Sequence, residues 1–243
     1  MAKTTSRARS DRRDHPDGTL VLLDAAGTTV QVVPREVCEQ IRLMVGRLRL
    51  IDGGDVPARV GLISSIGGEG VTTLARCLGL VLSNDLGRTV CIVDLNWWSP
   101  APWTNDDETR GGVAEVIAAG APLDAVLVET GNAGLAFLPA GRSALSERPL
   151  LSNSEALGTV LDELGERFDH VILDLPSVAA SSDAVTLADR AGNVLLVVQQ
   201  GAATDADIQA AVDRIGAVTL LGSVLNRHAS RLPAFVRRRI PGA

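Results

Sequence analysis

The feature that most constrains this chain is an alternation of short, unbroken apolar runs with segments of helical periodicity. From Arg59 onward the apolar runs are RVGLISS, RTVCIVDL, FDHVILDL, NVLLVVQQ and TLLGSVLN, and the helical pattern VTTLARCLGLVLSN follows the first of them. Strands without polar alternation are buried on both faces, as in a parallel sheet covered by helices. We therefore predict an α/β fold with a mostly parallel sheet and helices on both faces.

A hairpin and a helix are predicted ahead of this sheet. Residues 19–33 read as two short strands around a turn, and residues 35–50 place apolar side chains at helical spacing. A chain of 243 residues with 46% hydrophobic content is large enough to bury one core. We predict a single domain over residues 19–230, in which residues 19–50 form the hairpin and helix, between a disordered basic segment at 1–18 and a basic tail at 231–243.

Charge is unevenly distributed along the chain. Residues 1–18 carry five Lys or Arg against three Asp, and residues 227–243 carry five Arg and no acid. Positions 19–226 keep 13 of the 23 basic and 26 of the 29 acidic residues. An acidic body argues against binding to nucleic acid, whereas the basic tail could contact anionic lipid or an acidic partner. A solubilising, disordered end is the alternative for that tail.

The cysteines and the hydropathy pattern indicate a cellular compartment. Cys38, Cys77 and Cys91 lie far apart inside apolar stretches and have no histidine at metal-ligand spacing, which favours reduced, buried thiols. No stretch is apolar for the roughly 18 residues that a membrane span requires, and the N-terminus has no hydrophobic leader. We expect a cytoplasmic protein, with peripheral contact at the inner face of the membrane left open.

The segment with the clearest chemistry is SSIGGEGVTT, from Ser64 to Thr73. It follows a predicted strand and opens a predicted helix. Glycines let successive backbone N–H groups curl around an anion, and the helix N-terminus adds partial positive charge. The segment therefore predicts a phosphate-binding loop, and a tight turn that needs glycine is the structural alternative.

Six segments in order extend this pattern over about residues 34–227. They resemble the capsular exopolysaccharide family of bacterial tyrosine kinases (BY-kinases), which are relatives of the MinD/ParA P-loop ATPases. The resemblance implies a cytoplasmic ATPase fold that docks on a membrane protein controlling polysaccharide export, with ATP or ADP and Mg²⁺ as cofactors. The segments are SSIGGEGVTT, VCIVDLNWWSP, LAFLPAG, ERFDHVILDLPSV, DAVTLADRAGNVLLVVQQGAAT and LLGSVLNR.

The resemblance also implies roles for single residues. Thr72 matches the loop hydroxyl that holds Mg²⁺, and Asp174 matches the Walker B aspartate at the metal. Asp94 matches the Walker A′ aspartate near the metal and the attacking group, so it would be the catalytic residue of an active protein. Either aspartate could instead cap a turn after a buried strand. The implied cofactor-binding residues are Gly67, Gly68, Glu69, Gly70, Val71, Thr72, Thr73 and Asn226, the last of them near the adenine.

The departures from the family pattern concern positive charge. Val71 occupies the place of the loop lysine, and Ile66 occupies that of a second lysine in MinD/ParA relatives. Phosphoryl transfer needs fixed positive charge, and loss of one preorganised donor costs at least about 10²–10³ in rate. We therefore predict a degenerate Walker A motif, with nucleotide binding weak or lost. The chain has no tyrosine, so tyrosine autophosphorylation is excluded, whereas ATP hydrolysis or phosphorylation of another protein is not.

Two further segments bear on partners. Trp97, Trp98 and Trp103 are concentrated at the predicted ligand-binding edge, where they form either an exposed protein-binding hot spot or a buried cluster. The family's oligomerisation helix has the pattern E-x-x-R-x-x-R. Here Glu39 replaces the first arginine between Glu36 and Arg42, which argues against a homo-octameric ring and leaves another oligomer open.

These observations favour a degenerate ATPase-like protein that regulates or scaffolds assembly of cell-surface polysaccharide. Its expected partner is a membrane polysaccharide copolymerase-type protein or a catalytically intact relative. One alternative is a weakly active ATPase or kinase that uses a donated basic residue. Another is a MinD/ParA-like positioning protein, although the acidic body and the absent second lysine count against it.

Overall fold

The computed structural model describes residues 18–227 except residues 52, 102 and 104–110. The predicted terminal segments at 1–18 and 231–243 lie outside the described residues, apart from Gly18. A seven-stranded sheet in the order β5-β6-β4-β7-β3-β8-β9 forms the centre, and only the β5–β6 pair is antiparallel. The strands are β3 (Arg59–Ser64), β4 (Val90–Asp94), β5 (Val128–Glu129), β6 (Leu135–Leu138), β7 (His170–Asp174), β8 (Asn193–Gln199) and β9 (Thr219–Asn226).

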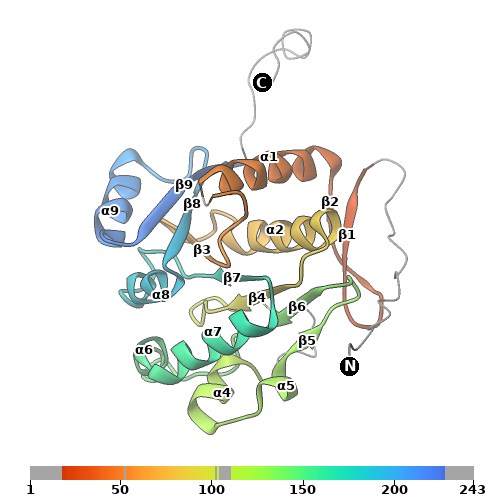
Figure 1. Cartoon of the computed structure of the whole chain (residues 1–243). Coiled ribbons are helices and arrows are strands. Elements are labelled where there is room, and N and C mark those ends of the chain that lie inside the picture. Colours follow the sequence, from red (N-terminus) through yellow and green to blue (C-terminus); the bar gives the residue numbers. More distant parts are fainter. Residues whose placement is uncertain (1–17, 52, 102, 104–110, 228–243) are drawn as a thin grey trace.

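Helices cover both faces of the sheet, so the predicted α/β class is confirmed (Figure 1). A separate antiparallel hairpin, β1 (Leu20–Leu23) and β2 (Thr29–Val33), precedes them as predicted. None of the described helices has both the length and the apolar character that a membrane crossing requires. The helices are α1 (Arg35–Ile51), α2 (Val71–Leu86), α4 (Val113–Ala119), α5 (Leu123–Val126), α6 (Arg148–Asn153), α7 (Glu155–Arg167), α8 (Asp183–Ala191) and α9 (Asp205–Ile215).

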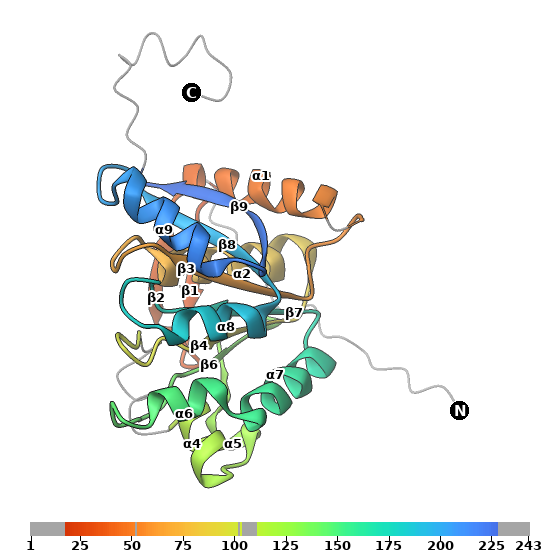
Figure 2. The ribbon, with the colours of Figure 1, turned by 90° about the vertical axis from the view of Figure 1, so that its left-hand side faces the viewer.

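Two hydrophobic cores lie on opposite faces of the sheet. The hairpin, α1 and α2 pack on one face, and the helices from α4 to α9 pack on the other. Figure 2 shows this second face, with α6, α8 and α9 towards the viewer. Successive strand residues point to opposite faces, so Leu62 belongs to the first core and Ile63 to the second. The unbroken apolar runs of the sequence are therefore explained by burial on both sides.

The three cysteines are buried free thiols, as the sequence predicted. Cys38 and Cys77 lie in the core under α1 and α2, and Cys91 lies in the core on the other face. Burial raises the pKa of Cys77 to about 12, so its thiol stays protonated at neutral pH.

Helix α2 approaches the sheet closely at Gly79. A Cβ atom at Gly79 would lie 2.8 Å from Cδ1 of Ile92 on β4 and 3.2 Å from Cδ1 of Leu135 on β6. At Gly46 in α1, by contrast, a Cβ atom would meet no atom within 4 Å. The two helical glycines therefore form a matched pair, one packed against the sheet and one in open space.

We expect Gly46→Ala to raise the free energy of unfolding by roughly 0.5–1 kcal/mol, because alanine is the better helix former. Gly79→Ala has the same propensity gain but overpacks the interface of α2 with β4 and β6, which typically costs about 1–3 kcal/mol. Urea denaturation of both variants would measure the difference. Equal stabilisation by the two changes would contradict the close approach of α2 to the sheet.

Candidate functional site

The loop between β3 and α2 has the backbone form of an anion-binding turn. Gly68 and Gly70 have φ angles of 84° and 93°, in a region that residues with a Cβ atom adopt only with strain. Gly67 and Gly68 are exposed, and no side chain caps the N-terminus of α2. The first N–H groups of a helix have no partner within the helix. The loop therefore offers these donors to an anion.

The side chain of Glu69 is turned into the protein and holds this loop in place. Its carboxylate is fully buried and accepts hydrogen bonds from the N–H groups of Ser65 at 3.0 Å and Ile66 at 3.1 Å. Its other oxygen accepts from the N–H of Gln199 at 2.8 Å, at the end of β8. The Asn226 side chain, at the end of β9, donates to the Glu69 carbonyl at 2.8 Å. The loop is therefore fastened to two strands of the sheet.

These contacts place two of the predicted cofactor-binding residues. The carboxylate of Glu69 serves the loop from within, so only its main chain is available to a ligand. Asn226 lies directly beside the loop, where its amide nitrogen is close to Gly70. The structural role of Glu69 was not predicted. The one indication in the sequence was that an acidic side chain is unexpected in a loop that binds anions.

Asp94 and Asp174 lie side by side at the carboxyl ends of β4 and β7, where they are directly paired in the sheet. Both are buried, with 1% and 2% of their surface exposed. Asp94 accepts hydrogen bonds from the N–H groups of Asn96 at 2.8 Å and Ala101 at 2.9 Å. The Thr72 hydroxyl interacts with the Asp174 carboxylate and lowers its pKa, and Oδ1 of Asp174 has no partner among the described residues. The structure thus brings together the three predicted metal-holding residues.

Burial perturbs both carboxylates. Removal from water and the neighbouring charge of Asp94 raise the pKa of Asp174, the Thr72 hydroxyl opposes this rise, and the resulting pKa is about 8. Removal from water also raises the pKa of Asp94 to about 6. Two adjacent carboxylates, one of which has an unpartnered oxygen, and a hydroxyl group fit a hard cation such as Mg²⁺. Among the described residues no three His, Cys, Asp or Glu cluster around one point, so phosphate oxygens would have to complete the coordination.

Positive charge reaches this site from α2 and not from the loop. Val71, the first residue of α2, is only 8% exposed and belongs to the core under that helix. Arg76 lies one helical turn after Thr72, and its charge lowers the pKa of both aspartates. Its guanidinium donates to the carbonyl of Ala101 at 2.8 Å. Arg76 was not predicted from the sequence, although it follows Thr72 by four positions and therefore lies on the same face of the helix.

The tryptophans do not form an exposed hot spot. Trp97 and Trp103 are 2% and 3% exposed, so that hypothesis is wrong for both, and the alternative of burial holds. The indole N–H of Trp97 donates to the carbonyl of Ala140 at 2.8 Å, and the Trp103 ring packs 5.1 Å from that of Phe137. Each ring thereby buries its apolar body and satisfies its polar group. Trp98 alone is half-buried.

Comparison with known proteins agrees with this geometry. The sequence model of a family described as "Cellulose biosynthesis protein BcsQ" matches residues 58–225. The tyrosine-protein kinase ptk of Acinetobacter johnsonii is 26% identical over 121 residues, which are 49% of this chain and only 16% of that kinase.

Two solved structures share the fold. The kinase domain of the Escherichia coli tyrosine kinase ETK has a TM-score of 0.69 at 19% identity, over 81% of this chain and 79% of that one. The septum site-determining protein MinD of Pyrococcus horikoshii, in complex with Mg-ADP, has a TM-score of 0.56 at 21% identity, over 74% and 75%. The expected P-loop ATPase fold of the BY-kinase and MinD type is thus confirmed.

The buried aspartates predict an unusual dependence of stability on pH. An acid whose pKa is raised by folding holds its proton more tightly in the folded chain. Its contribution to stability therefore falls as pH rises from about 4, the unfolded pKa, through the folded pKa of about 8 for Asp174. In metal-free buffer we expect Asp174→Asn to match wild type at pH 4 and to exceed it by more than about 1 kcal/mol at pH 8.

Asp169 provides the matched control for this experiment. Hydrogen bonds from Thr89 lower the pKa of Asp169, so Asp169→Asn should be less stable than wild type above about pH 4, and this difference should shrink as pH falls below that value. Chemical denaturation at several pH values measures both variants. A loss of stability in Asp174→Asn at pH 8 would contradict the raised pKa.

Proposed function

The chain belongs to the BcsQ family of cellulose biosynthesis proteins, and from that premise we propose that it is a degenerate nucleotide-binding protein that regulates or scaffolds bacterial polysaccharide synthesis. One observation carries the proposal. The loop, Thr72, Asp94 and Asp174 form one site, while the apolar Val71 begins the helix where bound phosphates need a fixed positive charge.

The retained part of the site supports ATP or ADP with Mg²⁺ as its ligand. The turn with positive φ angles and the uncapped helix would receive the phosphates, and a MinD structure with this fold is complexed with Mg-ADP. Thr72, Asp94 and Asp174 would hold Mg²⁺, whose charge would offset that of the phosphates and of the two buried carboxylates. These residues are the part of the site on which any nucleotide binding would depend.

The missing part of the site supports weak binding and little turnover. Val71 packs into the core and presents no donor to the loop. Charge that develops during phosphoryl transfer must be met by preorganised positive groups, and no side chain of the loop supplies one. We therefore assign this chain a regulatory or scaffolding role beside a membrane polysaccharide copolymerase-type protein or a catalytically intact relative.

The ion pairs of helix α1 favour a partner protein other than another copy of this chain. Glu39 accepts from Arg35 within the same helix at 2.7 Å, and Arg42 forms an ion pair with Asp85 of α2 at 2.6 Å. Two of the three residues of the altered oligomerisation pattern, Glu39 and Arg42, therefore have partners inside the chain. A homo-oligomeric contact through this face would compete with these pairs.

We expect Val71→Lys to tighten binding of Mg-ADP by about 10- to 100-fold, since a hydrogen bond to a charged group contributes about 1.5–3 kcal/mol. Isothermal titration calorimetry on wild type and variant would measure this change. Val71→Met is the matched control, because it adds a side chain of similar reach without charge and should leave the affinity unchanged. Hydrolysis of Mg-ATP by the wild-type protein should be negligible.

The degenerate assignment would be overturned by robust wild-type hydrolysis that Asp174→Ala abolishes. Equal tightening by Val71→Lys and Val71→Met would show that charge is not what the site lacks. Both variants alter a core position, so thermal unfolding should confirm that each remains folded before titration.

Arg76 favours a second candidate, a weakly active ATPase or kinase whose basic residue is donated from elsewhere in the same chain. Its guanidinium lies 5.3 Å from the Trp103 ring centroid, and its charge acts on both Asp94 and Asp174. It is therefore a positive group within electrostatic reach of the site and outside the loop. The proposal is that Arg76 takes over part of the role of the absent lysine.

This candidate predicts slow but measurable turnover that depends on Arg76. Arg76→Met keeps an apolar stem over Trp103 and should reduce turnover at least about tenfold, because a charge facing the transferred group is lost. Arg47→Met, on the exposed surface of α1, is the control and should have no effect. A phosphate-release assay measures both, and equal turnover in wild type and Arg76→Met would exclude this role.

A further inference from the structure

A cavity of about 380 Å³ adjoins Asp94, between the end of β4 and the segment after β6. It lies at the β6 side of the sheet, whereas β8 and β9, with Gln199 and Asn226, lie on the other side of β3. The cavity is therefore distinct from the loop between β3 and α2. Its walls include Asp94, Trp97, Trp98, Pro139, Arg142 and Arg148.

Two arginines line this cavity, and the Glu115 carboxylate beside it accepts hydrogen bonds from the backbone N–H groups of Gly112 and Arg142. Neither Arg142 nor Arg148 forms an ion pair with any residue that the structure describes. The Nε–H of Arg148 is buried and has no acceptor within the described part of the chain. Asp94 also lines the cavity, but both of its oxygens accept backbone N–H groups and only 1% of its surface is exposed. The accessible charge is that of the arginines.

Aromatic packing holds one of these arginines in position. The guanidinium of Arg148 lies over the ring of Trp98, 5.7 Å from its centroid. Trp98 in turn meets the buried Trp97 edge to face, with ring centroids 6.4 Å apart. Trp97 is anchored through its bond to the carbonyl of Ala140. Arg148 is thus oriented by stacking, which leaves its charge unneutralised.

We propose that this cavity binds a small molecule that carries an oxyanion, a phosphate or a carboxylate, on a ring. A guanidinium presents planar, paired donors that match the oxygens of either anion. The half-buried Trp98 provides an apolar wall for a ring. A volume of about 380 Å³ lies within the usual range for small-molecule sites.

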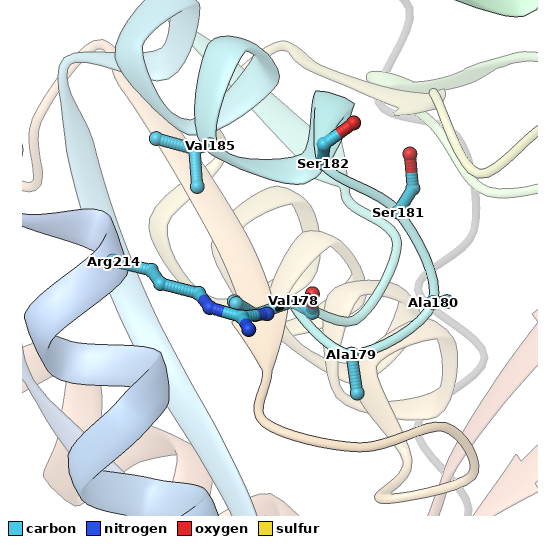
Figure 3. A pocket seen from close by; sticks show the side chains of 7 residues that line it. All are labelled: Val178, Ala179, Ala180, Ser181, Ser182, Val185 and Arg214. Atoms are coloured by element: carbon cyan, nitrogen blue, oxygen red, sulfur yellow. Dashed lines mark hydrogen bonds between the residues drawn. The ribbon is translucent and has the colours of Figure 1, made fainter.

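A second cavity, of about 420 Å³ between α8 and α9, also contains an arginine, but its polar side chains do not point to one common position. Arg214 reaches across it towards the carbonyl of Val178, at 3.4 Å, while the hydroxyl groups of Ser181 and Ser182 point away from the guanidinium (Figure 3). Ser181 bonds instead to Asp183. Arg214 is therefore a suitable control arginine.

The test is calorimetric titration of the full chain, without nucleotide, with three ligands that share a pyranose ring. Glucose 1-phosphate carries a phosphate, glucuronate a carboxylate, and methyl glucoside no charge. We expect at least one anionic ligand to bind and methyl glucoside not to bind. Arg148→Gln and Arg142→Gln should each weaken binding by about tenfold or more, because each removes a charged hydrogen bond. Arg214→Gln should leave the affinity unchanged.

The two anionic ligands also identify the group that the cavity prefers, and binding of either supports the proposal. Absence of binding by both would overturn it, as would equal binding of methyl glucoside. Equal weakening by Arg214→Gln would overturn it too, since the effect would then reflect net charge and not this cavity. Thermal unfolding of each variant ensures that a loss of binding is not a loss of fold.

Discussion

Two carboxylates buried side by side are the constraint on which the rest of the site depends. Asp94 and Asp174 end neighbouring parallel strands, so the sheet itself brings their charges together away from water. Ionisation of both there is costly unless positive charge or hydrogen-bond donors compensate. The described residues provide two backbone N–H groups, the Thr72 hydroxyl and the charge of Arg76, and among them one oxygen of Asp174 still has no partner.

A cation bound at the two buried carboxylates would compensate their charge, and Mg²⁺ bound with a nucleotide is one such cation. Mg²⁺ prefers a few carboxylate or hydroxyl ligands and shares the rest of its coordination with phosphates. The uncapped N-terminus of α2 lies where such phosphates would bind, directly before Thr72. The same helix contributes an apolar residue at its start, Val71, and a basic residue one turn further along, Arg76. Thr72 and the two aspartates therefore lie together beside the start of α2, and the positive charge that acts on both aspartates comes from Arg76, further along that helix.

The segment that follows β4 joins this site to both cores of the protein. Trp97 packs on one face of the sheet and Trp103 on the other, so the segment is anchored across the sheet's edge. Its backbone supplies the donors that hold Asp94, and its half-buried Trp98 orients Arg148. Trp97 and Trp98, which the sequence suggested for contact with a partner protein, instead line a cavity beside Asp94.

The amino-acid sequence by itself determined the elements, the fold class and the position of the loop. Unbroken apolar runs such as the one ending at Ser64 have one stable solution, a sheet buried on both faces, and a glycine pattern before a helix is a local signal. The family resemblance implied roles for Thr72, Asp94 and Asp174, and the two aspartates lie together because the ends of neighbouring parallel strands meet at one edge of the sheet. These inferences rest on periodicity and on neighbours close in the chain.

Only the tertiary structure decided which way the side chains of the site face. Glu69 turns inward because the N–H of Gln199, 130 residues away, completes its carboxylate's hydrogen bonds. Trp103 is buried because the Leu23 carbonyl, 80 residues away, accepts its indole N–H. Arg148 stacks on a tryptophan 50 positions earlier in the chain. Such contacts depend on how distant segments pack, and a linear pattern of residue types carries no information on the distances between them.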